Sequence, residues 1–255
     1  MAAVRRLSLL LLLAALLSAC GCSSSAPGPD PAAARSTTTA EGSARFTLLI
    51  DAVVAGSRVQ SSETGTISFA KRLAHFYKLV PGGGLPQELI FDGPYTYTNA
   101  NVEAALKDRS IRPWTKLDTR RLSAKERKSR PDELAHVRTL VHLPDGIEGP
   151  VRVDSSTVAD ERVTQFRGQV DPKRVIARAP APIRPGLAQA MSNDYPAKPF
   201  VARFWLDDAG RVRRVLVAYN TPGGTEISLD GRFSDFGVAI DVETPPARSI
   251  QDLTP

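Results

Sequence analysis

The stretch "FVARFWLDDAGRVRRVLVAYNTPGGTEISLDGRFSDFGVAIDVETPP", residues 200–246, determines the fold class. Three runs rich in β-branched and aromatic residues are separated by the turn sequences Asp-Asp-Ala-Gly and Pro-Gly-Gly. Runs joined by short Gly-containing turns are typical of antiparallel hairpins. We therefore expect a meander of three strands, followed by a last extended piece that ends at Pro245-Pro246.

Strand patterns continue upstream of this meander. In "ARFTLLIDAVV", residues 44–54, every second residue is apolar, which is the period of a strand with one buried side. In "TGTISFAKRLAHFYKLV", residues 64–80, five apolar residues have the same parity, interrupted at Lys71 and His75, and are expected on one face: Ile67, Phe69, Leu73, Tyr77 and Leu79. Shorter strands are expected in residues 88–99 and 113–118, and two more in residues 151–170.

Helical signals are few. Ser123 and Glu126 have the spacing of a capping box. Pro131-Asp132-Glu133 has the composition of a first helical turn, and the apolar residues from Leu134 to Val141 then follow at helical spacing. A shorter helix is expected from Pro185 to Met191. The fold class is therefore α+β, with about nine strands and two or three helices.

The expected sheet is too large for its helices to cover. A sheet with this apolar surplus must curl into a half-barrel wrapped around the helices, which either fills its interior with side chains or leaves a cavity. Alternation selects nine inward residues as candidate cavity residues, although each also suits a plain core: Phe46, Leu48, Ile50, Ile67, Phe69, Phe204, Leu206, Val215 and Val217.

The N-terminus has the organisation of an export signal. The apolar run from Leu7 to Leu17 is far shorter than the roughly 20 residues of a membrane-spanning helix. Arg5 and Arg6 precede this run and small residues follow it, as in a signal peptide. The nearly pure leucine run favours the general secretory path, and the arginine pair leaves a twin-arginine route open.

Both cysteines of the chain, Cys20 and Cys22, follow this run directly, so none is left for a disulfide in the folded part. Leu-Ser-Ala-Cys, residues 17–20, resembles the lipobox of bacterial lipoproteins. This resemblance implies cleavage between Ala19 and Cys20, acylation of Cys20 with fatty acids such as palmitate, and anchoring at the cell membrane. Cys22 is a poorer second match, and an ordinary secretory signal is the remaining alternative.

Composition divides the chain into three parts: a lipoprotein signal peptide at residues 1–19, a disordered tether at 20–42, and one domain at 43–250. The tether is rich in Ser, Thr, Ala and Pro and has hardly a large apolar residue. Loss of the two signal-peptide arginines lowers the formal net charge from +6 to +4. This mild charge favours no nucleic-acid partner, and we expect a monomer.

No catalytic motif emerges from the sequence. The three histidines are His75, His136 and His142, and none belongs to a recognisable nucleophile, phosphate-loop or zinc motif. Glu133 and His136 have half of a di-iron spacing, but a solvated helix face explains them better. We therefore expect no enzyme, no metal and no cofactor.

One basic run stands out between the strands and the long helix: Arg120, Arg121, Lys125, Arg127, Lys128 and Arg130. A solvated helix surface explains this run, and the alternative is contact with anionic headgroups of a membrane.

The lipobox, the tether, "TGTISFA", "FWLDDAGRVRRVLVAY" and "DFGVAIDVETPPA" together resemble actinobacterial lipoproteins of the LppX/LprG type, which have the LolA/LolB-like fold. The resemblance covers residues 44–247. It implies a hydrophobic cavity that takes acyl chains of a lipid or glycolipid at the outer face of the cytoplasmic membrane and carries them across the envelope. The alternative is a surface-anchored interaction or sensory module with a filled core and no ligand.

Overall fold

The computed structural model describes residues 28–54, 56–79, 85–129, 133–221 and 224–255. Its strands are β1 (Ser43–Val54), β2 (Ser57–Ser68), β3 (Leu73–Leu79), β4 (Gln87–Asp92), β5 (Tyr95–Thr98), β6 (Trp114–Asp118), β7 (Ile147–Val158), β8 (Glu161–Val170), β9 (Phe200–Asp207), β10 (Val212–Asn220), β11 (Glu226–Ser234) and β12 (Ile250–Asp252). The helices are α2 (Ala34–Ala40), α3 (Val102–Lys107), α4 (Ala124–Ser129), α5 (Glu133–His142), α6 (Pro172–Arg178) and α7 (Arg184–Asp194), with 3₁₀ turns η1 (Leu143–Gly146) and η2 (Ala247–Ser249).

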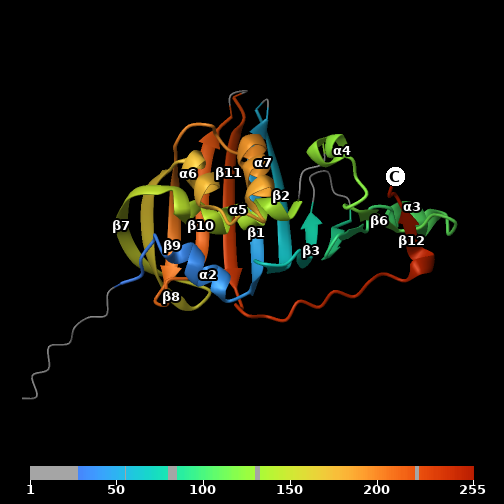
Figure 1. Ribbon diagram of the computed structural model, residues 1–255, viewed down its shortest axis with the longest axis horizontal. Helices are drawn as coiled ribbons and strands as arrows, with labels where there is room; N and C mark the ends of the chain where they lie inside the picture. The colour runs from blue at the N-terminus through green and yellow to red at the C-terminus, as the bar shows by residue number, and fades with distance from the viewer. Residues whose placement is uncertain (1–27, 55, 80–84, 130–132, 222–223) are drawn as a thin grey trace, which may run out of the picture.

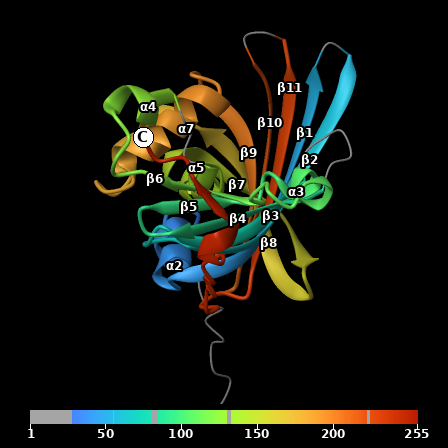
Figure 2. The same ribbon diagram turned by 90° about the vertical axis from the view of Figure 1, so that its right-hand side faces the viewer.

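Within the described residues, twelve strands form one sheet in the order β12-β6-β5-β4-β3-β2-β1-β11-β10-β9-β8-β7. Every neighbouring pair is antiparallel except β12 and β6, which are parallel. The meander expected from residues 200–246 is present as β9, β10 and β11. The sheet curves around α5, α6 and α7, which lie on one of its faces (Figures 1 and 2). The predicted α+β half-barrel is therefore confirmed.

The core lies between this helix-covered face and the helices. Strand register places Leu48 opposite Gly231, Gly231 opposite Val215, and Val215 opposite Phe204, so these residues share one face across four strands. Further along the sheet, the rings of Phe46 and Phe76 pack edge to face with centroids 5.6 Å apart. The burial of these side chains provides most of the hydrophobic stabilisation of the fold.

Helix α5 fills the centre of the half-barrel. Its apolar side is fully buried, with Leu134 and Val137 at 0% exposure. Leu140 packs directly over Gly231 of β11, where a Cβ atom would lie 2.4 Å from the Leu140 Cδ1 atom. Glycine at this position lets the helix approach the strand closely, so the interior is close-packed here.

Local capping signals act as expected. The Ser123 backbone N–H donates to the Glu126 carboxylate at 2.8 Å, and the Glu126 N–H donates to the Ser123 Oγ at 3.2 Å, which confirms the capping box before α4. Helix α6 was not expected from the sequence, although Asp171 accepts a hydrogen bond from the Lys173 N–H and Pro172 follows it. This Asp-Pro pair is the signal that would have found α6.

The expectation for residues 64–80 is wrong in part. Ile67 and Phe69 are buried, but Tyr77 and Leu79 are 45% and 46% exposed. Residues 69–72 form a turn between β2 and β3, and the buried face of β3 carries Ala74 and Phe76 instead. The alternation of buried and exposed residues does not stay in phase through a turn. The pairing of each strand determines which of its residues point to the core.

The packed part of the chain begins before residue 43. Helix α2, Ala34–Ala40, lies within the expected tether, yet Ala34 and Thr38 are fully buried. The Thr38 hydroxyl accepts a hydrogen bond from the Val212 N–H at 2.8 Å. Figure 1 shows α2 beside the lower ends of the strands. A low average hydrophobicity concealed this helix, because it docks with two small residues rather than with large apolar ones.

Candidate functional site

All nine residues proposed for a cavity lie on the helix-covered face of the sheet or at its end, within the core. Eight of them are at most 5% exposed, and Ile50 is partly buried against the same core. The structure thus places them together, and their contact with a ligand stays a prediction. Ala19 and Cys20, the predicted cleavage and lipidation residues, lie outside the described residues, as do the rest of the predicted signal peptide and residues 20–27 of the predicted tether.

A cleft of about 260 Å³ opens where α5 and α7 meet the turn between β2 and β3. We call it the helical cleft. Eight residues line it: Ala70, Arg72, Ala135, Arg138, Pro182, Ile183, Gly186 and Leu187. Ala135 and Leu187 are buried, at 6% and 3% exposure, so one wall of the cleft is continuous with the apolar core. The helical cleft is therefore amphipathic, with apolar walls and two arginines.

Both arginines of the helical cleft bind backbone carbonyl oxygens of neighbouring turns. Arg72 Nη1 donates to the oxygens of Gly93 and Tyr95 at 2.9 and 3.2 Å. Its guanidinium also lies 4.9 Å from the centroid of the Phe91 ring. Arg138 Nη2 donates to the oxygens of Ser68, at 3.1 Å, and Lys71. These contacts restrict both side chains to one geometry beside the cleft.

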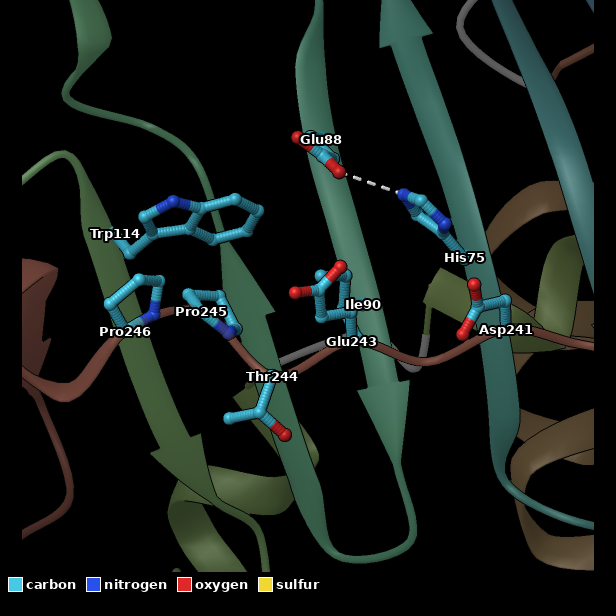
Figure 3. Close-up of a pocket in the computed structure, with 9 residues that line it drawn as sticks. All are labelled: His75, Glu88, Ile90, Trp114, Asp241, Glu243, Thr244, Pro245 and Pro246. Atoms are coloured by element: carbon cyan, nitrogen blue, oxygen red, sulfur yellow. Dashed lines mark hydrogen bonds and ion pairs between the residues drawn. The ribbon is translucent and has the colours of Figure 1, made fainter.

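A second cleft, of about 240 Å³, lies on the opposite face of the sheet (Figure 3). It forms between strands β3 to β6 and residues 238–249, which we call the C-terminal strap. The His75 Nε2 atom and the Glu88 carboxylate are 2.8 Å apart, so His75 is a half-buried and paired strand residue, as expected. Trp114, Pro245 and Pro246 form the apolar side of this cleft, and Asp241 and Glu243 make it acidic.

The strap also covers Tyr97 of β5. Burial raises the pKa of the Tyr97 hydroxyl; the nearby Lys116 charge opposes this increase, and the hydrogen bond with Thr244 of the strap opposes it to a smaller extent. Pro245 is buried against the sheet. The strap is therefore packed onto the outer face rather than loosely attached to it.

The third described cleft, of about 450 Å³, lies over β1, β2, β10 and β11 on the outer face. We call it the outer-face cleft, to distinguish it from the cleft under the strap. Leu49 and Leu79 line it and are 44% and 46% exposed. Asp230 lines it as well; burial raises the pKa of its carboxyl, but hydrogen bonds from Arg214 and Arg232 outweigh this effect, and the net pKa lies below its usual value. This surface combines exposed leucines with ion pairs.

Buried charged groups outside the clefts have structural contacts. The Asp145 Oδ2 atom lies 2.6 Å from Arg35 Nε of α2 and 3.5 Å from His142 Nδ1. Lys78 Nζ lies 3.2 Å from the buried Glu63 carboxylate. Among the described residues, no group of three or more His, Cys, Asp or Glu side chains could hold a metal ion. Glu133 and His136, the half di-iron spacing, lie on α5 without a matching pair in these residues.

The residues of the basic run from Arg120 to Arg130 do not share one environment. Arg120 donates to the Asp118 carboxylate and to the Tyr95 hydroxyl, so it belongs to the β5–β6 edge. Lys125 and Arg127 lie on exposed positions of α4. No helix in the described residues is long and apolar enough to cross a membrane.

No family model and no curated protein matches the chain. Among solved structures, LprF from Mycobacterium bovis has 12% identity and a TM-score of 0.48, over 86% of this chain and 99% of that one. The lipoprotein LppX from Mycobacterium tuberculosis has 9% identity and a TM-score of 0.45, over 84% and 98%. A LolA superfamily protein from Nitrosomonas europaea has 9% identity and a TM-score of 0.28, over 79% and 94%.

Proposed function

We propose that the protein is an exported lipoprotein, anchored through Cys20 to the outer face of the cytoplasmic membrane, that binds an acyl chain of a lipid or glycolipid and carries it across the envelope. The observation that carries this proposal is the helical cleft, whose apolar wall is continuous with the core and whose lining also includes two arginines. An amphiphile has the same division into an apolar chain and a polar head. The proposal assigns the protein a binding role and no catalytic step.

The size of the helical cleft limits what it holds in this conformation. Sites for drug-sized ligands measure about 300–1,000 Å³, whereas the helical cleft measures about 260 Å³. It therefore accommodates part of a long acyl chain. A complete chain requires α7 to move away from α5, which widens the cleft along the buried Leu187 and Ala135.

Native mass spectrometry of a form of the protein that begins at residue 21 and so lacks the predicted anchor, isolated gently from the source cells, tests this proposal. We expect a bound lipid. Ile183→Trp places a large ring in the helical cleft and should remove the lipid, whereas Leu49→Trp, in the outer-face cleft, should retain it. An empty wild-type protein, or equal lipid in both variants, would contradict the assignment of the acyl chain to this cleft.

A second candidate function, an interaction module with a filled core, is favoured by two observations. Leu140 packs directly against Gly231, so α5 and β11 are in close contact at this point of the core. The outer-face cleft exposes Leu49 and Leu79. If no lipid is found, a partner that crosslinks to this outer face and is lost on Leu49→Asp would support the interaction module.

The anchor is tested separately by metabolic labelling with a fatty acid. We expect the label in wild type and in Cys22→Ser, and no label in Cys20→Ser, because Leu-Ser-Ala precedes Cys20. Durable anchoring needs two or more acyl chains, since a single chain gives marginal binding at about 0.8 kcal/mol per buried methylene. Label retained in Cys20→Ser and lost in Cys22→Ser would move the anchor to Cys22.

A further inference from the structure

We infer that the cleft under the C-terminal strap binds a guanidinium group, which stacks on Trp114 and pairs with the Asp241 and Glu243 carboxylates. The ligand is a small organic cation with N–H donors: a free guanidine or the side chain of an arginine in a partner protein. This inference goes beyond the proposed function and does not depend on it, because this cleft and the helical cleft lie on opposite faces of the sheet.

The first argument is charge. The residues that line the cleft under the strap include three carboxylates, those of Glu88, Asp241 and Glu243, and neither Lys nor Arg. The Glu88 carboxylate lies 2.8 Å from His75 Nε2. Asp241 and Glu243 form no ion pair or hydrogen bond within the described part of the chain. A cleft lined by charges of one sign concentrates ions of the opposite sign, so this cleft attracts a cation.

The second argument is the aromatic wall. Figure 3 shows the Trp114 indole at one side of the cleft and His75 at the other. The other tryptophan of the chain, Trp205, has the Arg214 guanidinium 4.6 Å from its ring centroid. Among the described residues, no cation lies over Trp114. Guanidinium groups stack on tryptophan faces, so Trp114 provides a second, independent contact for the same cation.

The third argument is that the neighbouring lysine of β6 binds elsewhere. The Lys116 Nζ atom lies 3.5 Å from the Asp252 carboxylate and 4.8 Å from the centroid of the Tyr95 ring. Lys116 does not line the cleft under the strap. It therefore leaves the carboxylates of the strap available to a ligand.

The fourth argument is a buried acceptor beside the cleft. The Asn99 N–H donates to the Glu88 oxygen at 2.9 Å, which continues the register that pairs Thr98 with Leu89. Asn99 and Glu88 therefore lie on the same face of the sheet. The Asn99 Oδ1 atom is buried and has no hydrogen-bond partner among the described residues. A buried acceptor without a donor is costly, and a guanidinium group supplies N–H donors.

The size of the cleft limits the ligand to a small group. Its volume of about 240 Å³ is below that of sites for drug-sized ligands, which begin at about 300 Å³. Ile90 and Pro246 line the cleft together with the charged side chains, and they provide apolar contacts for a short alkyl stem. A guanidinium group on such a stem matches both parts of this lining.

An NMR titration of the form of the protein that begins at residue 21 tests this inference. Its two tryptophan indole N–H signals are the reporters, and Trp114→Phe assigns them. Butylguanidinium and butanol are matched probes that differ in charge. We expect butylguanidinium to shift the Trp114 signal, to leave the Trp205 signal unchanged, and to bind at least about fivefold more tightly than butanol, because a cation–π contact and an ion pair each contribute.

Variants of the strap connect this preference to its carboxylates. Asp241→Asn and Glu243→Gln should each weaken butylguanidinium binding about threefold, and the double variant should remove the preference over butanol. Both side chains are exposed, and thermal unfolding checks that each variant is folded. Glu103→Gln removes an exposed carboxylate of α3 outside the cleft, so it is the matched control and should leave the preference intact.

A blocked tripeptide with arginine between two glycines distinguishes the two sources of the guanidinium group. A tripeptide that binds as tightly as butylguanidinium supports an arginine of a partner protein, whereas a tripeptide that does not bind supports a free guanidine. Equal binding of butylguanidinium and butanol would overturn the inference, as would a preference that survives in the double variant. Both results leave the proposed function standing, because these probes carry no long acyl chain.

Discussion

Two glycines on the helix-covered face of the sheet determine how closely other parts of the chain approach. At Gly231 an added Cβ would lie 2.4 Å from the end of the Leu140 side chain. At Gly65 it would lie 2.2 Å from the backbone oxygen of His75 and 2.4 Å from the Phe76 Cβ atom. A side-chain end can rotate away, whereas backbone in a paired strand cannot.

This difference predicts that replacement by alanine lowers the free energy of unfolding by different amounts at the two positions. Gly231→Ala should lower the free energy of unfolding by about 1–3 kcal/mol, as expected for an overpacked core. Gly65→Ala should cost more than about 3 kcal/mol, because β2 and β3 must separate. Chemical denaturation of both variants measures these values.

A double-mutant cycle is the control for Gly231. Leu140→Ala alone should cost about 2–5 kcal/mol, and Gly231→Ala combined with Leu140→Ala should cost less than the sum of the two. A strictly additive result would show that the two positions do not touch.

Asp118 makes the fold sensitive to acid. The hydrogen bond from the Arg120 side chain lowers the pKa of the Asp118 carboxyl to about 2, although burial opposes this change. An unfolded aspartate has a pKa of about 3.9. Because the folded pKa is the lower one, the stabilisation is present above about pH 4 and is lost as the pH falls toward about 2.

We therefore expect Asp118→Asn to unfold with a weaker pH dependence than wild type between about pH 4 and pH 2. Denaturation at several pH values in this window measures the slope. Arg120→Gln should flatten the slope similarly, because it removes the main hydrogen bond to Asp118. Identical slopes for wild type and Asp118→Asn would rule out this contribution.

At the scale of elements, helix α2 connects the predicted anchor to the half-barrel. Its Thr38 hydroxyl accepts from the Val212 N–H at 2.8 Å and donates to the Ala34 oxygen at 2.7 Å, and the residue is fully buried. The Arg35 side chain of the same helix pairs with the buried Asp145. These contacts dock a helix that has few large apolar residues.

Thr38→Val keeps the shape of the side chain but leaves the buried Val212 N–H without its acceptor. We expect a loss of about 1–3 kcal/mol in the free energy of unfolding. Thr37→Val is the matched control on the same helix, since Thr37 bonds within the helix and is only partly buried. Equal stability of the two variants would show that α2 is undocked and that the tether extends to residue 42.

At the scale of the whole molecule, the C-terminal strap connects the middle of the sheet to its far edge. The strap leaves β11, crosses the outer face, and ends in β12, which pairs with β6 (Figure 1). The Leu253 N–H donates to the Lys116 oxygen at 2.9 Å, and the Asp118 N–H donates to the Thr254 hydroxyl at 3.0 Å. β12 and the residues after it thereby cover the backbone groups of an edge that would otherwise attract other strands.

Removal of residues 247–255 should therefore loosen one edge of the sheet and leave the meander intact. Hydrogen exchange should become faster at β6, residues 114–118, while β9 to β11 keep slow exchange. The meander serves as the internal control within the same protein. Unchanged exchange at β6 would show that β12 does not protect this edge, and faster exchange throughout would show that the strap stabilises the whole sheet.

The sequence by itself determined the features that depend on neighbouring residues. Periodicity, turn residues and cap spacing act over a few positions. They were sufficient to predict the meander, the α5 and α7 segments, and the capping box at Ser123 and Glu126. The half-barrel also followed, because an apolar surplus of strands over helices is a property of composition and pattern. The resemblance to LolA-like lipoproteins rested on the order of these same segments.

Tertiary structure alone decided which distant segments meet. β1 pairs with β11 and β12 with β6, and no local pattern encodes these partners. Such pairings determine that Tyr77 is exposed and that α2 docks through Thr38. They also place Arg72 and Arg138 in the lining of one cleft. The physical reason is that local signals fix backbone conformation, whereas a cleft requires long-range contacts whose loop-closure entropy is offset only when the whole sheet assembles.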